Sequence, residues 1–237
     1  RKVVYTVAPG KTWGLSQHLD RANLPQGVCD SIGVEQQNEV LDLKRRDYLP
    51  LRPALASQKL PVYWKTDPHW NTVGAATFAK SVAGALDPKL GHAQRYTYST
   101  ETRLGLLTTE QGGDTPEVGP RAVPAGGVKT RTARGTPDWS GYPSVTFDHS
   151  WVSGPRGKTW PGRTLLLGDS FMWYALESLQ PVFRQGRFIW LGKVPVDSLL
   201  RAIRRADTVV LESYAVFGSP LSAPAFRKAV AQALAKK

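Results

Sequence analysis

An aspartate and a histidine stand two residues apart in the stretch YWKTDPHWN. In an extended or turn segment this spacing lets the carboxylate of Asp67 reach Nδ1 of His69, and Pro68 between them stiffens the backbone. Such a contact fixes the imidazole tautomer and leaves Nε2 free to take a proton from a nucleophile. A local hydrogen bond before a helix is the structural alternative. The stretch therefore contains a candidate general base that needs a nucleophile from elsewhere in the chain.

A serine follows a strand-like run in the stretch RTLLLGDSF. Leu165–Leu167 indicates a buried strand, Gly168 permits a tight exit, and Ser170 then lies where a helix begins. This context is typical of a nucleophile elbow, which presents a hydroxyl at the carboxyl edge of a sheet. The backbone N–H groups of Ser170 and Phe171 are candidate oxyanion donors at the first helical turn. Asp169 is expected to hold the elbow through hydrogen bonds to backbone, and a plain helix-capping serine is the alternative.

Three further histidines compete for the role of base. His149 follows an aspartate directly in FDHSW, and adjacent side chains of an extended chain point to opposite faces. That stretch also lacks a strand–loop–helix context. His18 and His92 have no acidic neighbour at a useful spacing. We therefore predict that His69 serves Ser170, with His149 as the rival.

Apolar runs and helical patterns alternate along the chain, and these elements must position the three residues. The expected strands are Val3–Val7, Val40–Leu43, Thr164–Leu167, Phe188–Leu191 and Thr208–Leu211. The expected helices are Thr72–Leu86, with Asn71 or Thr72 as its cap, Phe171–Gln180, Val196–Arg205 and Ala223–Ala235. Nearly continuous apolar strands are typical of parallel sheets covered on both faces. The alternation after residue 164 predicts an open parallel sheet with helices on both sides.

Residues 112–162 break this alternation, because glycine and proline are frequent there and apolar runs are short. We interpret the segment as a long irregular excursion over the surface, so that residues 1–237 form a single domain. Its aromatic residues are Trp139, Tyr142, Phe147, Trp151 and Trp160. These rings either wall a binding groove or attach the excursion to the body.

The composition restricts the remaining classes of function. The formal net charge of +12 favours a polyanionic partner, but no nucleic-acid recognition motif is present, and we expect no nucleic acid partner. Acidic polysaccharide, teichoic polymer or anionic lipid would match the charge equally well. The single cysteine excludes internal disulfides, and four scattered histidines without a ligand motif predict no metal centre. No apolar run approaches the roughly 20 residues of a membrane span.

The pair T-D-x-H-W and G-D-S-F is typical of SGNH-type hydrolases and acyltransferases. In ordinary members the serine comes first, whereas here Asp67 and His69 precede Ser170. This permuted order and the phrase YWKTDPHWNTVGA resemble the SGNH hydrolase-like domain of the alginate O-acetyltransferases, the AlgX/AlgJ group. Weaker similarities, which extend the resemblance over nearly the whole chain, are VAPGK at residues 7–11, GGD at 112–114 and TVVLES at 208–213.

The resemblance implies a three-layer α/β/α sandwich around a central parallel sheet and a serine-dependent O-acetyltransferase. The acceptor would be an extracytoplasmic polysaccharide, anionic by the sign of the net charge, and no metal or cofactor besides an acyl donor would be needed. A membrane-bound O-acyltransferase that supplies the acyl group is a candidate partner. The protein is then expected outside the cytoplasm, either free or tethered through a segment upstream of residue 1. One departure is that Ser213 and Tyr214 follow Glu212 where the family usually has an arginine.

Residues near the motifs are candidates for substrate binding, since sugar rings stack well on aromatic faces. These candidates are Trp70, Asn71, Trp173, Tyr174 and Tyr214. Core packing is the alternative for the rings. An esterase that uses water as acceptor would share the acyl-enzyme and is the second function that stays open. A non-catalytic carbohydrate-binding protein is the third, although it would have no need of the full triad.

Overall fold

The computed structural model describes residues 1–14, 21–23, 33–34, 46–125, 128–134, 148–154, 158–191, 193–214, 228 and 232. Two expected elements fall outside these residues. The expected strand Val40–Leu43 lies entirely outside the described residues. Of the expected helix Ala223–Ala235, only Lys228 and Gln232 are described, and both are helical.

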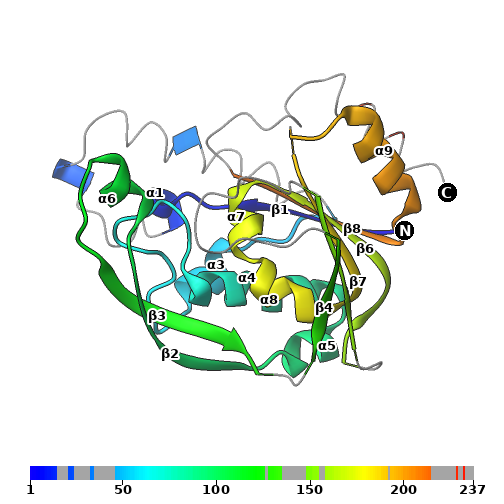
Figure 1. The fold of residues 1–237 in the computed structure, drawn as a ribbon, viewed down its shortest axis with the longest axis horizontal. Helices are drawn as coiled ribbons and strands as arrows, with labels where there is room; N and C mark the ends of the chain where they lie inside the picture. Colours follow the sequence, from blue (N-terminus) through cyan, green and yellow to red (C-terminus); the bar gives the residue numbers. More distant parts are fainter. Residues whose placement is uncertain are drawn as a thin grey trace.

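A six-stranded sheet forms the centre of the molecule (Figure 1). In sheet order its strands are β1 (Lys2–Ala8), β8 (Thr208–Tyr214), β6 (Trp160–Gly168), β7 (Phe183–Trp190), β5 (Asp148–Ser153) and β4 (Thr130–Arg134). The first four pair in parallel, whereas β5 and β4 are added in antiparallel fashion beyond β7. The expected parallel sheet is therefore confirmed for the strands with long apolar runs. The expectation is wrong at the edge formed by β5 and β4, because the antiparallel pairing of these strands makes the sheet mixed. Antiparallel strands are common at the edge of an otherwise parallel sheet.

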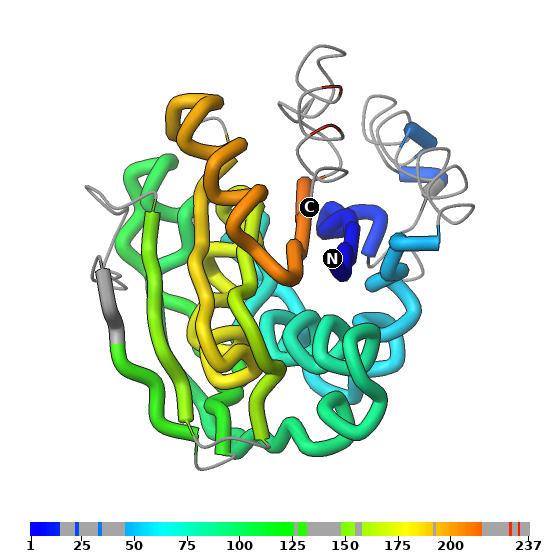
Figure 2. The backbone as a smooth tube through the Cα atoms, turned by 90° about the vertical axis from the view of Figure 1, so that its right-hand side faces the viewer, coloured from blue at the N-terminus to red at the C-terminus, as the bar shows by residue number. Residues whose placement is uncertain are grey.

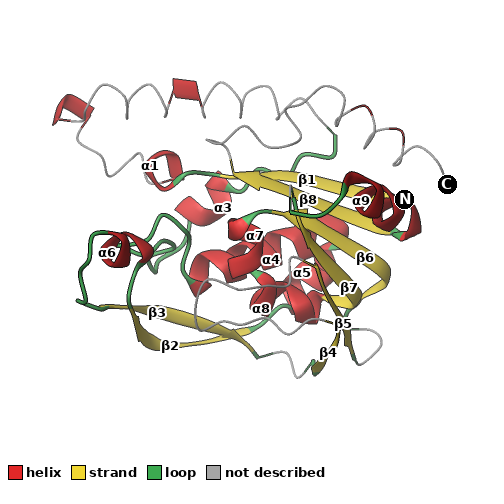
Figure 3. Ribbon diagram, turned by 45° about the horizontal axis from the view of Figure 1, so that its top comes forward, coloured by secondary structure: helices red, strands yellow, loops and turns green. Residues whose placement is uncertain are grey.

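Apolar side chains fill both faces of this sheet and give the fold three layers. In β6, Leu166 belongs to the core that includes helix α4 (Thr72–Leu86), whereas Leu165 and Leu167 belong to the core under α9 (Val196–Arg205). Strand β8 alternates in the same way. Burial on both faces explains why these strands read as continuous apolar runs. Figure 3 shows α9 on one side of the sheet and α4 on the other.

Helix α4 has the bounds expected from the sequence. Its cap is Asn71, whose side-chain oxygen accepts hydrogen bonds from the N–H groups of Val73 and Gly74 at 2.9 and 3.1 Å. The helix is buried around most of its circumference, because α3 (Arg52–Ala56) and α5 (Pro88–Ala93) pack on it as well. The other described helices are α1 (Lys11–Gly14), α6 (Leu106–Glu110), α7 (Ser170–Tyr174) and α8 (Leu176–Leu179), with 3-10 turns η2 (Arg21–Asn23) and η3 (Gln180–Val182).

The expected helix Phe171–Gln180 is divided into α7 and α8. The break falls at Ala175, which is fully buried and whose N–H donates to the carbonyl of Met172 at 3.0 Å. The nearby residues Trp173 and Leu176 are buried as well, whereas Tyr174, directly before Ala175, is partly buried. Tertiary packing thus turns the chain at a point where the local sequence favours a continuous helix.

A two-stranded sheet lies outside the central one. Strands β2 (Tyr96–Arg103) and β3 (Glu117–Pro124) pair antiparallel and are connected through α6. We call residues 96–124 the hairpin arm. In Figure 1 it runs below the central helices, and β3 contacts α4 and α8.

The interpretation of residues 112–162 as irregular is wrong for β3, β4 and β5, which lie within this segment, and for the start of β6 at Trp160. Gly119 and Pro120 interrupt β3, and β4 and β5 are short strands in which polar or charged residues are frequent, so none of the three has a long apolar run. Trp151 is buried and donates from its indole to the carbonyl of Gln180 at 2.9 Å, and Trp160 donates to Oγ1 of Thr208 at 2.9 Å. These two rings attach the segment to the body, while Trp139, Tyr142 and Phe147 lie outside the described residues.

Figure 2 shows β1, at the N-terminus, beside the orange strand β8. No helix in the described part of the chain combines the length and apolar composition that a membrane crossing requires.

Candidate active site

Ser170, His69 and Asp67 form one chain of hydrogen bonds, although Ser170 and His69 are 101 residues apart in the sequence. Oγ of Ser170 lies 2.8 Å from Nε2 of His69, and Nδ1 of His69 lies 2.7 Å from Oδ1 of Asp67. A carboxylate only accepts hydrogen bonds, so Nδ1 carries the proton and Nε2 is free to accept one from the serine. The arrangement is that of a Ser-His-Asp triad.

A tight loop holds the Asp-His pair. An antiparallel bridge between Tyr63 and Trp70 closes the loop. Within it, the backbone N–H of His69 donates to Oδ1 of Asp67 at 2.9 Å, the same oxygen that binds the ring. Asp67 thus orients both the backbone and the imidazole of His69. The loop ends at Asn71, the cap of α4, so the buried helix fixes its position.

The second carboxylate oxygen of Asp67 contacts the hairpin arm. Oδ2 accepts from Nη2 of Arg103 at 3.1 Å and from the N–H of Leu106 at 3.2 Å. Burial opposes the ionisation of Asp67, but hydrogen bonds from the side chain and backbone of His69, and the charges of His69 and Arg103, outweigh it and lower its pKa. Asp67 therefore stays ionised. Arg103 belongs to no sequence motif and lies 36 residues from Asp67, so no local pattern in the sequence points to this contact.

Ser170 lies at the expected junction of strand and helix. β6 ends at Gly168, and α7 begins at Ser170. A Cβ atom on Gly168 would lie 2.6 Å from Oε2 of Glu212 and 2.6 Å from Cβ of Met172. The close approach of these side chains explains why glycine occupies the exit from the strand.

Asp169 holds the elbow, as predicted. Its Oδ1 accepts from the N–H of Phe171 at 2.9 Å, and its Oδ2 accepts from the N–H of Tyr214 at 2.7 Å. The first contact corrects the expectation that Phe171 supplies an oxyanion donor, because its N–H is already bound. The N–H of Ser170 is at the first position of α7, where a helix provides no internal acceptor, and stays the candidate donor.

A second buried acid lies beneath the elbow. Oε2 of Glu212 accepts from the N–H of Asp169 at 3.3 Å, and Oε1 has no hydrogen-bond partner among the described residues. Burial, followed by the negative charge of Asp169, raises the pKa of Glu212 well above its ordinary value. Burial also raises the pKa of Asp169, despite hydrogen bonds from the backbone of Phe171 and Tyr214. In the sequence, Glu212 stood out only through the weak family similarity of the stretch TVVLES, residues 208–213.

Replacing Glu212 with glutamine is expected to make stability less sensitive to rising pH. The folded protein keeps a proton on Glu212 at pH values where the unfolded chain has released it, because the folded pKa is raised. Wild-type stability therefore falls as pH rises from the ordinary glutamate pKa toward the folded one. Within that window the difference in unfolding free energy between mutant and wild type should grow by about 1.4 kcal/mol per pH unit.

Chemical denaturation at a series of pH values measures this difference. Glu110→Gln, at an exposed position of α6, is the control for loss of a carboxylate at the surface. A difference for Glu212→Gln that does not change with pH would mean that the pKa of Glu212 is not raised in the folded protein.

Three of the residues expected to bind substrate have structural roles instead. Trp70 is 1% exposed, and its ring packs on Phe171 at a centroid distance of 5.1 Å. Trp173 is 4% exposed and packs on Phe188 at 5.8 Å. Asn71 is buried as the cap of α4. The prediction of substrate binding is wrong for these three, because the rings fill the core behind the site.

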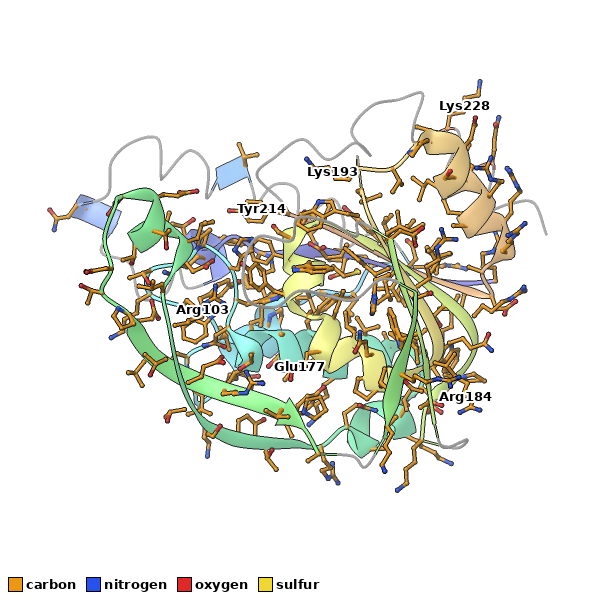
Figure 4. The ribbon with its side chains drawn as sticks, in the orientation of Figure 1. Arg103, Glu177, Arg184, Lys193, Tyr214 and Lys228 are labelled. Carbon is orange, nitrogen blue, oxygen red and sulfur yellow. The ribbon has the colours of Figure 1, made fainter. Side chains whose placement is uncertain are left out.

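Tyr174 and Tyr214 are only partly buried and lie beside the triad. The ring of Tyr174 is 4.5 Å from that of His69. The ring of Tyr214 stacks on Phe171 at 4.7 Å, and Figure 4 shows Tyr214 near the start of α7. Substrate binding stays a prediction for both.

His149 lies away from Ser170. It is buried in β5, its Nε2 is 2.8 Å from Nε2 of Gln180, and its ring stacks on Trp151 at 5.6 Å. Because the amide nitrogen of Gln180 donates, Nε2 of His149 acts as a structural acceptor. His92 lies in α5, and His18 lies outside the described residues. Nowhere in the described ranges do three His, Cys, Asp or Glu side chains gather in a group that could hold a metal ion.

Solved structures with a similar fold include several proteins of low sequence identity. Bacillus cereus PatB1 with a sulfonyl adduct has a TM-score of 0.63 and 17% identity, over 92% of this chain and 82% of that one. The O-acetyltransferase domain of Pseudomonas putida AlgJ has a TM-score of 0.55 and 18% identity, over 98% and 82%. Pseudomonas aeruginosa AlgX has a TM-score of 0.55 and 14% identity, over all of this chain but 58% of that one. These similarities establish the fold.

No curated protein sequence matches this chain. A family model described as the SGNH hydrolase-like domain of the acetyltransferase AlgX matches residues 2–130, more than half of the chain. The matched segment contains Asp67, His69 and the whole hairpin arm, and Ser170 follows it. The chain therefore belongs to the AlgX family of SGNH hydrolase-like acetyltransferases.

Proposed function

We propose that this protein transfers acetyl groups to hydroxyls of an anionic, extracytoplasmic polysaccharide through an acetyl-Ser170 intermediate. The observation that carries the proposal is the hydrogen-bonded chain from Ser170 through His69 to Asp67, which joins two distant parts of the sequence. Membership of an acetyltransferase family supplies the reaction class.

In the first half-reaction, Nε2 of His69 takes the proton of Ser170 while Oγ attacks the carbonyl carbon of an acetyl donor. The N–H of Ser170 is the proposed donor to the oxyanion. His69 then passes the proton to the leaving group, the bond to that group breaks, and acetyl-Ser170 is left. Asp67 stays ionised and stabilises the imidazolium, in keeping with its lowered pKa.

In the second half-reaction, a sugar hydroxyl gives its proton to His69 and attacks the acetyl carbon. The tetrahedral intermediate then releases the acetylated sugar, and His69 returns the proton to Oγ of Ser170. Water in place of the sugar would yield acetate, so an esterase would use the same residues. The proposed steps require no metal and no cofactor besides the acetyl donor.

The formal net charge of +12 supports an anionic acceptor. Tyr174 and Tyr214 are the proposed aromatic contacts for its sugar rings. An acceptor of this kind implies a reaction outside the cytoplasm, with a membrane-bound O-acyltransferase as the proposed source of acetyl groups. Nucleic acid has no part in the proposal.

The test of the reaction is intact-protein mass spectrometry after mixing with a small neutral acetyl ester. The protein should gain one acetyl group, which an acidic oligosaccharide should remove while becoming acetylated itself. A neutral oligosaccharide is the control for the charge of the acceptor. If the acetyl-enzyme forms but decays to acetate at the same rate with every sugar, the protein is an esterase and the transferase proposal is wrong.

Raising the ionic strength is expected to raise KM for the anionic polymer while leaving hydrolysis of the neutral ester unchanged. A cationic surface concentrates a polyanion locally, and salt weakens that attraction as the Debye length falls to about 8 Å at physiological strength. Initial rates at increasing salt measure the effect. Polymer turnover that is indifferent to salt would refute the anionic acceptor and leave acyl transfer intact.

A further inference from the structure

The hairpin arm binds the backbone that leads into Asp67. Glu117, the first residue of β3, accepts from the N–H of Lys65 at 2.8 Å and from the N–H of Thr66 at 2.6 Å. The same carboxylate accepts from the hydroxyl of Thr66. In α6, the N–H of Leu107 donates to the carbonyl of Thr66 at 3.0 Å. The segment before the triad acid is therefore held by the arm on both its N–H and its carbonyl side.

The arm lies directly on this segment at Gly105. A Cβ atom at Gly105 would be 2.1 Å from Oγ1 and 2.3 Å from the carbonyl oxygen of Thr66, so the close approach requires glycine. It brings the next residue, Leu106, within hydrogen-bonding distance of Oδ2 of Asp67. The contact therefore belongs to the backbone geometry of the arm.

Arg103, the last residue of β2, supplies the charged contact to Asp67. Its guanidinium lies over the ring of Trp64 at 5.1 Å and over the ring of Tyr174 at 5.4 Å. Figure 4 shows Arg103 between the arm and the central helices. Two aromatic rings restrict the orientation of the guanidinium, and a planar fork in a restricted orientation holds a carboxylate better than a flexible ammonium does.

Several charges surround the His69–Asp67 pair. Arg103 comes from β2, and Asp169 of the elbow acts on His69. Lys11 of α1 is attracted by Glu117 and Asp67, although burial dominates and lowers its pKa. Besides His69, Arg103 is the cation within ion-pair distance of Asp67 among the residues that the structure describes.

We propose that Arg103 is a positioning residue of the triad: held by the arm, it fixes the orientation and the negative charge of Asp67 and so sets the pH range in which His69 acts as a base. The inference rests on the proposed function, because it assumes that the triad performs acyl transfer. Arg103 contacts no reacting atom and acts through Asp67.

Arg103→Gln is the first test, with hydrolysis of a small neutral acetyl ester as the assay. A looser Asp67 should lower kcat by about 10- to 100-fold with little change in KM. Loss of a cation favours the protonated form of the His69–Asp67 pair, so the acid limb of the pH–rate profile should move up by about one pH unit. Arg103→Lys keeps the charge and should restore the acid limb while recovering only part of kcat.

Arg121→Gln is the matched control. Arg121 of β3 pairs with Glu101 at 2.8 Å and with Glu177 of α8 at 3.1 Å, so it attaches the same arm to the body without contacting the triad. Glu177 is seen beneath the central helices in Figure 4. This variant should leave the acid limb in place. Thermal unfolding measures the folded fraction of each variant at the assay temperature, so that rates are compared only between folded proteins.

Two outcomes separate the inference from the function on which it rests. If Arg103→Gln is folded and shares the acid limb of wild type and Arg121→Gln, the positioning role is wrong. If the wild type never forms acetyl-Ser170, the proposed function fails, whatever the variants do.

Discussion

Ser170→Ala is expected to abolish acetyl-enzyme formation and to lower kcat by about 10⁶-fold, the size of loss found when a triad nucleophile is removed. The reason is that Oγ of Ser170 is the atom that His69 contacts at 2.8 Å, at the end of the central strand β6. Alanine keeps the helix start, because Asp169 caps α7 with its own side chain. The fold should therefore survive the change.

Labelling with a serine-reactive fluorophosphonate measures the loss directly. The wild type should be labelled at Ser170 and the mutant should not. Ser81→Ala is the matched control, since Ser81 donates only to the carbonyl of Thr77 within α4 and should leave labelling unchanged. Equal labelling of Ser170→Ala and wild type would place the nucleophile elsewhere.

His69→Ala is expected to lower kcat by a similar factor of about 10⁴ to 10⁶, whereas His149→Ala should keep wild-type kcat. His69 links Ser170 to Asp67, while His149 is buried against Gln180 and Trp151. Loss of His149 leaves the amide of Gln180 without its acceptor and should lower the unfolding free energy by about 1 to 3 kcal/mol.

The two histidine variants form a crossed comparison. Ester hydrolysis measures kcat, and chemical denaturation measures stability. The expected pattern is an inactive, folded His69→Ala and an active, less stable His149→Ala. The reverse pattern of activity would assign the base to His149.

Elements with strong local signals could be predicted from the sequence. The bounds of Thr72–Leu86 and Val196–Arg205 coincide with α4 and α9, because a cap or an apolar face marks each helix without help from distant residues. The Asp67–His69 spacing and the strand–GDSF–helix context likewise depend on short stretches. The structure brings the two stretches together, with Nε2 of His69 at 2.8 Å from Oγ of Ser170.

The hairpin arm could not be predicted in the same way. Strand β2 carries mostly exposed polar residues, and β3 contains Gly119 and Pro120, so neither has an apolar run. Arg103 and Glu117 become meaningful only when the arm folds onto residues 65–67, a contact that no local pattern encodes.

The burial of side chains close to the motifs could not be predicted from their position in the sequence either. Trp70 and Trp173 adjoin the motifs, yet both rings face the core, whereas Tyr174 and Tyr214 stay partly exposed. Neighbours of a catalytic residue point in other directions, because successive side chains alternate between the faces of a strand and are distributed around a helix. Sequence distance to His69 or Ser170 therefore says little about access to substrate.

The strand that leads to Ser170 pairs on both sides with strands made after it. β6 lies between β7 and β8 in the sheet, and β1, made first, is joined to the sheet through β8. During synthesis, a nascent chain that has not reached residue 208 lacks β8, the strand that pairs with both β6 and β1. Contacts of such large sequence separation are slow to form. We therefore expect the elbow beside Ser170 to be complete only once β8 has been made, because Glu212 and Tyr214 of β8 are hydrogen-bonded to Asp169.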